Sequence, residues 1–205
     1  MGIFQQMTEK PWLPVEGAGE EPAEQRAFSL ASPHVGLRVF LAVATVLFTL
    51  FLVVYVERMA LPDWRPLSEP WVLWLNTLIL VISSAGFHWA WVNADRENLE
   101  GIKTGLLAGG MASFAFLAGQ LWAWRLLVDL GYYDMANPAI GFFYLLTGVH
   151  GVHLLGGLVA WFRTNAKVKA EVEMDQLRMS VGLCAIYWHF LLVVWLVLFG
   201  LLLLT

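Results

Sequence analysis

The chain has 205 residues, of which 59% are hydrophobic and only 14% are charged. Soluble domains carry about 25% charged residues, so this composition points to a protein built for lipid. The formal net charge of −4 excludes the basic surface that nucleic-acid binding requires. The single cysteine, Cys184, excludes an internal disulfide and a thiolate metal cluster.

The first region in chain order is an acidic tail, residues 1–33, which is interrupted by several prolines. Its run EGAGEEPAEQ at 16–25 has too few apolar side chains to build a core. We therefore expect a flexible segment that orders only against a partner. Residues 34–205 are expected to form one membrane domain.

Five apolar stretches follow the tail. A helix that crosses a bilayer needs about 20 mostly apolar residues, and each stretch is long enough. The predicted spans are 35–56, 71–93, 104–128, 139–162 and 180–204. The predicted fold class is therefore all-α, a polytopic integral membrane protein built as a bundle of five transmembrane helices.

The basic residues predict how the chain is oriented. Most of them flank one side of the membrane: Lys10, Arg26, Arg38, Arg96, Lys103, Arg163, Lys167, Lys169 and Arg178. The other side has Arg58, Arg65 and Arg125. The positive-inside rule thus predicts a cytoplasmic N-terminus and an outside C-terminus. The segment 163–178, which mixes both charges, is expected to be a solvated cytoplasmic connector.

Carboxylates are absent from the middle of every predicted span, although intramembrane charges usually mark function. A stand-alone pump or channel is therefore disfavoured, and no catalytic residue is predicted. Arg125 and Asp129, four residues apart on one helix, are expected to neutralise each other. Arg38 lies near a span end, where its side chain is expected to reach a lipid phosphate. His88 and Trp91 are two further candidates for lipid contact.

Four histidines lie deep in the predicted spans: His88, His150, His153 and His189. His150 and His153 lie within about 60° of each other on one helix, a spacing that allows two ligands to share a metal. Diiron bundle proteins use this offset together with glutamates, and no carboxylate is available here. A histidine–metal membrane enzyme is kept as the less favoured alternative, because the histidine spacing fits a metal but the carboxylates are missing. The favoured interpretation is that neutral imidazoles, of His150, His153 and His189, hydrogen-bond across helices or to backbone carbonyls.

Small and polar residues on two spans predict helix packing. Gly141, Thr147, Gly148 and Gly151 gather on one face of the fourth span, roughly opposite the histidines. Small residues on one stripe allow close helix approach in lipid, so a neighbouring helix is expected against this face. The second span carries Asn76, Ser83 and Ser84, which are expected to form further interhelical polar contacts.

The fourth span reads FYLLTGVHGVHLLGGL (143–158), and the last span contains YWHFLLVVWLVLF (187–199). The first motif looks like the signature helix of subunit III of the haem–copper respiratory oxidases, and the second resembles that family's closing helix, which typically reads YWHFVDVVWLFLF. Three shorter matches have the family's order: VGLRVFLA (35–42), LNTLILVISS (75–84) and GQLWAW (119–124). The likeness covers about 34–200.

The resemblance implies a five-helix bacterial form of the subunit, in the cytoplasmic (inner) membrane, that is not catalytic by itself. Haem and copper would lie on partner subunits, with no cofactor in this chain. The implied partners are oxidase subunit I as the main contact, other oxidase subunits, membrane phospholipids and a respiratory supercomplex. The implied function is to stabilise subunit I and to organise bound lipid during oxygen reduction.

Three positions depart from the family pattern. Where relatives carry acids in F-L-A-S-E, in Q-x-x-E-W and in the closing helix, this chain has Ala44, Ala123 and Leu192. Direct help with proton uptake by those groups is therefore in doubt. The same departures keep open a second hypothesis, that the chain accompanies a nitric oxide reductase of the same superfamily.

Overall fold

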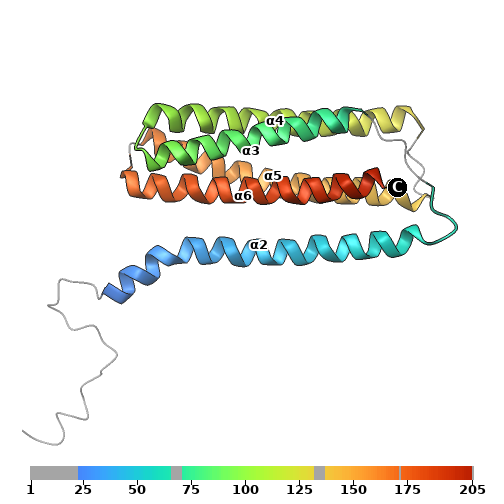
Figure 1. Cartoon of the computed structure of the whole chain (residues 1–205), viewed down its shortest axis with the longest axis horizontal. Helices are drawn as coiled ribbons and strands as arrows, with labels where there is room; N and C mark the ends of the chain where they lie inside the picture. The colour runs from blue at the N-terminus through green and yellow to red at the C-terminus, as the bar shows by residue number, and fades with distance from the viewer. Residues whose placement is uncertain (1–22, 66–70, 132–136, 171, 205) are drawn as a thin grey trace, which may run out of the picture. The chain divides into compact units, whose positions relative to one another are not determined.

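The structure is a computed structural model that describes residues 23–65, 71–131, 137–170 and 172–204, with side chains from Pro33 onward. Met1–Gly36 and Leu37–Thr205 form two separate units. Five helices occupy the described ranges (Figure 1): α2 (Ala23–Met59), α3 (Val72–Asp95), α4 (Leu99–Asp129), α5 (Pro138–Lys169) and α6 (Met174–Leu203). Most of the predicted acidic tail lies outside the described residues, and residues 23–33 are the first turns of α2.

Each of the five helices is long and apolar enough to cross a membrane, and each matches one predicted span, although Trp71 and Leu204 at the ends of two spans lie one residue outside α3 and α6. The predicted all-α fold with five transmembrane helices is confirmed. The helices are longer than the spans at several ends. In particular, α5 continues through Lys169 and α6 begins at Met174, so most of the predicted connector 163–178 is helical. Lys167 and Lys169 in the last turn of α5 favour this extension, because cations stabilise the negative end of a helix.

Local side chains determine where two of the helices begin. The side-chain oxygen of Asn98 accepts a hydrogen bond from the backbone N–H of Gly101 at 3.2 Å, which caps α4. Asn137 caps α5 in the same way through Ala139 N at 3.2 Å, and Pro138 occupies the first helical position. Just beyond α4, Gly131 has a φ of +90°, a conformation that favours glycine.

The backbones of α3, α4, α5 and α6 pack in a closed ring, with α4 beside α3 and α5, and α6 beside α5 and α3. Figure 1 shows these four helices running side by side. Helix α2 joins them differently, because none of its Cα atoms lies within 8 Å of a Cα of the other four helices in the described ranges. It contacts α5 through aromatic rings instead, and the ring centroids of Tyr55 and Phe142 are 5.5 Å apart.

The backbones of α3 and α4 approach closely at a glycine seam, which we define as Gly86 of α3 with Gly105 and Gly109 of α4. A Cβ placed on Gly105 would lie 2.6 Å from the backbone N of Ala90, and one on Gly86 would lie 2.8 Å from the backbone N of Gly109. Only glycine fits at such distances. Helices in lipid associate through this kind of close van der Waals contact.

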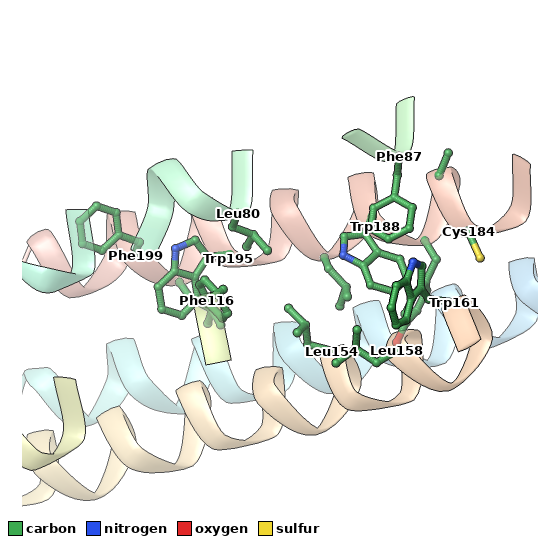
Figure 2. Close-up of a cluster of buried hydrophobic side chains, with 14 of the residues drawn as sticks. Leu80, Phe87, Phe116, Leu154, Leu158, Trp161, Cys184, Trp188, Trp195 and Phe199 are labelled. Carbon is green, nitrogen blue, oxygen red and sulfur yellow. The ribbon is translucent and has the colours of Figure 1, made fainter. Parts of the chain in front are cut away.

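Aromatic side chains fill the interior of the ring, as Figure 2 shows. Trp188 is fully buried, and its ring centroid lies 4.1 Å from that of Phe87. One indole further along α6, Trp195 meets Phe116 at 4.9 Å with the rings perpendicular. Indole N–H groups find acceptors, since Trp161 donates to the backbone O of Leu106 at 2.7 Å. The core is therefore packed, and the indole N–H groups of Trp161, Trp188 and Trp195 are hydrogen-bonded inside it.

Candidate functional site

His150 lies at the centre of the site that the sequence singled out, and it is fully buried. Its ring is 5.3 Å from Trp195 of α6, 5.8 Å from Phe116 of α4 and 6.4 Å from Phe48 of α2, measured between centroids. Among the described residues, neither ring nitrogen has a hydrogen-bond partner. The bond expected of His150, across helices or to a backbone carbonyl, is therefore not made within the described ranges. The imidazole acts as a packed ring among aromatic neighbours from three helices.

His153, one turn further along α5, is half-buried and does hydrogen-bond. Its Nδ1 lies 2.8 Å from the backbone O of Val149, and because a carbonyl only accepts, Nδ1 carries the proton in this bond. The bond stays within α5, so it holds the ring in place without joining two helices. An interhelical hydrogen bond at this position comes from Tyr187, whose hydroxyl donates to the backbone O of His153 at 2.8 Å.

His88 and His189 form a second histidine pair, on the surface where α3 and α6 meet. Their ring centroids are 5.5 Å apart, and Trp91 lies 6.0 Å from His88. The Nδ1 of His189 bonds to the backbone O of Ala185 in its own helix. Among the described residues, no hydrogen bond, ion pair or ring contact joins Arg38 to His88 or Trp91. Of the three candidate lipid ligands, only His88 and Trp91 are in ring contact.

Metal binding by these histidines requires more donors than the structure brings together. In the part of the chain that is described, no three residues among His, Cys, Asp and Glu converge. His153 and His189 each have Nδ1 engaged by a backbone carbonyl, which leaves one ring nitrogen per residue. The donor set of the alternative histidine–metal hypothesis is therefore limited to isolated pairs.

Polar side chains of α3 join it to α4. Ser83 bonds to the hydroxyl of Ser113 at 2.8 Å and donates to the backbone O of Gly109 at 2.9 Å. Asn76 donates to the side-chain oxygen of Gln120 at 3.3 Å, while Asn76 Oδ1 and Gln120 Nε2 have no partner in the part of the chain that the structure describes. Ser84 is buried nearby on the same helix. Asn76 and Ser83 thus each make a hydrogen bond to α4, whereas an interhelical bond of Ser84 stays a prediction.

The glycine face predicted on α5 is not where the helices approach most closely. A Cβ on Gly148 would lie 3.7 Å from Trp124, one on Gly151 would lie 3.9 Å from Leu117, and one on Gly141 would meet nothing within 4 Å. These are ordinary contacts, so the prediction of a close helix approach at these glycines is wrong. Thr147, on the same face, is buried and accepts a hydrogen bond from the indole of Trp124 at 3.1 Å.

The sequence analysis missed the glycines that do bring two helices together. Gly101, Gly105 and Gly109 recur every four residues in GIKTGLLAG, which places them on one stripe of α4. This spacing is the small-xxx-small pattern of membrane helix packing, and it was available in the sequence. Gly157 marks a second place where two helices come close, here α5 and α6, since a Cβ on Gly157 would lie 2.7 Å from the ring of Tyr187.

The three positions where the family resemblance implied acids are apolar in this chain, and two are buried. Ala44 of α2 is 3% exposed, and it lies one turn from Phe40 and one turn from Phe48, the two rings that contact His153 at 6.0 and 5.2 Å. Ala123 of α4 is fully buried, and Leu192 of α6 is half-buried. No side chain at these positions is able to carry a proton.

The packing of His150 gives a direct prediction. Replacing it by alanine is expected to lower the free energy of unfolding by about 2–4 kcal/mol, because a cavity forms among three aromatic rings. Replacing it by leucine is expected to change that free energy by less than about 1 kcal/mol, because the volume is kept and two unpaired nitrogens are removed. Unfolding in sodium dodecyl sulfate, followed by circular dichroism, measures both.

Val152→Ala is the control for this comparison, since Val152 lies on the same helix and is 67% exposed. We expect it to be nearly neutral. If His150→Leu were as damaging as His150→Ala, the imidazole nitrogens would matter and the packing account of His150 would be wrong.

Comparison with known proteins agrees with this architecture. The family Cytochrome c oxidase subunit III matches residues 34–204, a range that includes all five candidate spans except for Pro33 at the start of the first. A cytochrome c oxidase subunit 3 of Thermostichus vulcanus is 30% identical over 173 residues, which cover 82% of this chain and 85% of that protein. A probable cytochrome c oxidase subunit 3 of Nocardia farcinica (strain IFM 10152) is 29% identical, covering 86% of this chain and 91% of that protein. The chain belongs to the cytochrome c oxidase subunit III family.

Proposed function

We propose that this chain is a non-catalytic transmembrane subunit of a terminal haem–copper oxidase, which stabilises subunit I and organises bound phospholipid. The observation that carries the proposal is the family match over 34–204, which includes every helix of the ring and most of α2. In this proposal haem and copper are bound by partner subunits. They carry the electrons and the oxygen there, and this chain contributes protein and lipid contacts.

The distribution of polar and apolar side chains supports a scaffolding role. Buried polar groups such as Ser83, Ser113 and the Trp188 indole are bonded to one another inside the ring. Large apolar side chains cover the outside of every helix, for example Val43 on α2, Leu107 on α4 and Val193 on α6. Such faces suit contact with acyl chains and with the helices of a larger membrane assembly.

The apolar positions Ala44, Ala123 and Leu192 support a narrower role than that of relatives with acids there. A chain without those carboxylates has no group at these points that binds and releases a proton. We infer that proton uptake in the complex depends on partner subunits. This chain would lie in the bacterial inner membrane with its N-terminus in the cytoplasm, as its basic residues favour.

The same apolar positions favour a second candidate function, a subunit III-like partner of a nitric oxide reductase. The gas consumed by the complex purified through a tag on this chain distinguishes the two. Consumption of oxygen with reduced electron donor supports the oxidase. Consumption of nitric oxide, with none of oxygen, would replace the oxidase by the reductase.

A further inference from the structure

A groove runs along the last turns of α4 beside the first turns of α5, and none of the histidines or interhelical polar pairs of α3 lies in it. Its volume is about 1010 Å³. The side chains that matter for its chemistry are Leu121, Trp122, Trp124, Arg125, Asp129 and Tyr144. It lies at the end of the bundle that is predicted, from the distribution of basic residues, to face the side of the membrane opposite the cytoplasm.

The floor of the groove is fixed by bonds between α4 and α5. The indole of Trp124 donates to the hydroxyl of Thr147 at 3.1 Å, and its ring centroid lies 5.5 Å from that of Tyr144. The Tyr144 hydroxyl in turn donates to the backbone O of Trp124 at 3.5 Å. The aromatic wall is therefore held by both helices, so the shape of the groove is built into the fold.

Two exposed charges face this groove without neutralising each other. The sequence analysis expected an ion pair between Arg125 and Asp129, but neither residue is in an ion pair with any described side chain. Asp129 is also the last residue of α4, where the helix dipole disfavours an anion. The groove thus presents a guanidinium that forms no ion pair within the described ranges and, one helical turn further, a carboxylate that a cation would stabilise.

We propose that this groove binds a zwitterionic phospholipid with a primary ammonium group, such as phosphatidylethanolamine. Arg125 binds the phosphate, because a guanidinium donates two parallel hydrogen bonds to phosphate oxygens. Asp129 accepts from the ammonium, which two carbons join to the phosphate. Leu121 and Trp122, 58% and 48% exposed and further from the helix end, contact the first part of an acyl chain.

The two charges select the headgroup. An anionic lipid would place its charge near Arg125 but would leave Asp129 without a cation. Phosphatidylcholine carries a quaternary ammonium, which has no N–H to donate to a carboxylate. A partner helix with an acidic and a basic residue would fit the charges as well. The lipid is favoured because Trp122 and Trp124 mark the membrane interface, where headgroups lie.

This inference is independent of which gas the complex reduces. It assigns a location and a headgroup chemistry that the proposed lipid-organising function leaves open. Its test therefore uses lipid retention as the readout, whereas failure of the proposed function would show in the subunits that co-purify.

The test is lipid retention by the intact complex, purified through a tag on this chain and exchanged into detergent micelles. The micelles contain phosphatidylethanolamine, phosphatidylcholine or phosphatidylglycerol with identical acyl chains. Native mass spectrometry counts the lipids that remain bound. We expect Arg125→Gln and Asp129→Asn each to lower phosphatidylethanolamine retention at least threefold at this site. Arg96→Gln, an exposed arginine elsewhere, is the matched control and should change nothing.

The headgroups separate the two contacts. Asp129→Asn should leave phosphatidylglycerol retention unchanged, since only the ammonium contact is lost, whereas Arg125→Gln should lower it. Equal retention of phosphatidylethanolamine and phosphatidylcholine by the unmodified complex would overturn the proposal. So would unchanged phosphatidylethanolamine retention in both groove variants, or a structure of the complex with a partner's side chains in the groove.

Discussion

Replacing Gly105 by alanine is expected to weaken the fold more than the same change at any glycine of the predicted α5 face. The new Cβ would lie 2.6 Å from the backbone N of Ala90 and 2.8 Å from the backbone O of Gly86. Backbone atoms cannot turn aside as a side chain can, so α3 and α4 must separate. Overpacking of this kind costs about 1–3 kcal/mol, and separation would add the loss of the Ser83–Ser113 contact.

Gly148→Ala is the matched control, because it makes the same chemical change in the middle of α5. Both substitutions bring the same gain in helix propensity, about 1 kcal/mol on peptide scales. The Cβ on Gly148 would lie 3.7 Å from Trp124, in ordinary contact. We expect the Gly148 variant to unfold in sodium dodecyl sulfate at or above the midpoint of the unmodified chain, and the Gly105 variant well below it. The reverse order would show that α5 carries the close interface.

The second large effect is expected at Trp188, which joins α6 to three other helices at once. Its ring lies against Phe87 of α3 at 4.1 Å, and its indole N–H donates to Ser113 of α4 at 2.8 Å. On α5, a Cβ added to Gly157 would lie 2.9 Å from the indole. Trp188→Ala is expected to cost about 3–5 kcal/mol of unfolding free energy, the usual cost of removing a buried aromatic ring.

Trp188→Phe separates the ring from its hydrogen bond. It keeps most of the stacking on Phe87 and removes the donor to Ser113, so we expect a loss of about 1–2 kcal/mol. Trp89→Ala, on the exposed face of α3, is the control and should have little effect on unfolding, since that indole is 58% exposed. If Trp188→Ala and Trp89→Ala lowered the unfolding midpoint equally, burial inside the ring would not determine stability here.

The spans were predictable because hydrocarbon imposes a simple requirement, about 20 apolar residues for each crossing. The residues at which the helices begin and end were harder to predict. The extension of α5 to Lys169 follows from helix propensity and charge at the terminus, which average hydrophobicity does not report. The separate contact of α2, made by side chains such as Tyr55, depends on residues of α5 far along the chain, so no local pattern reveals it.

For the candidate site, the sequence predicted which residues are buried better than it predicted which hydrogen bonds they form. Burial of His150 follows from its place on an apolar helix, but its lack of a partner depends on Phe48, Phe116 and Trp195 all lying around it. The glycine seam shows the same limit. A stripe of small residues indicates that a helix is able to approach, and only the neighbour's position shows whether one does.

The central claim, that this chain is a cofactor-free subunit bound to an oxidase, is tested most directly by purifying it through a tag in mild detergent. We expect one copy of the chain for each copy of subunit I, with oxygen consumed by the complex. After the subunits are separated, we expect no stoichiometric iron, copper or zinc on this chain. Recovery of the chain without any oxidase subunit, carrying a stoichiometric metal of its own, would contradict the account.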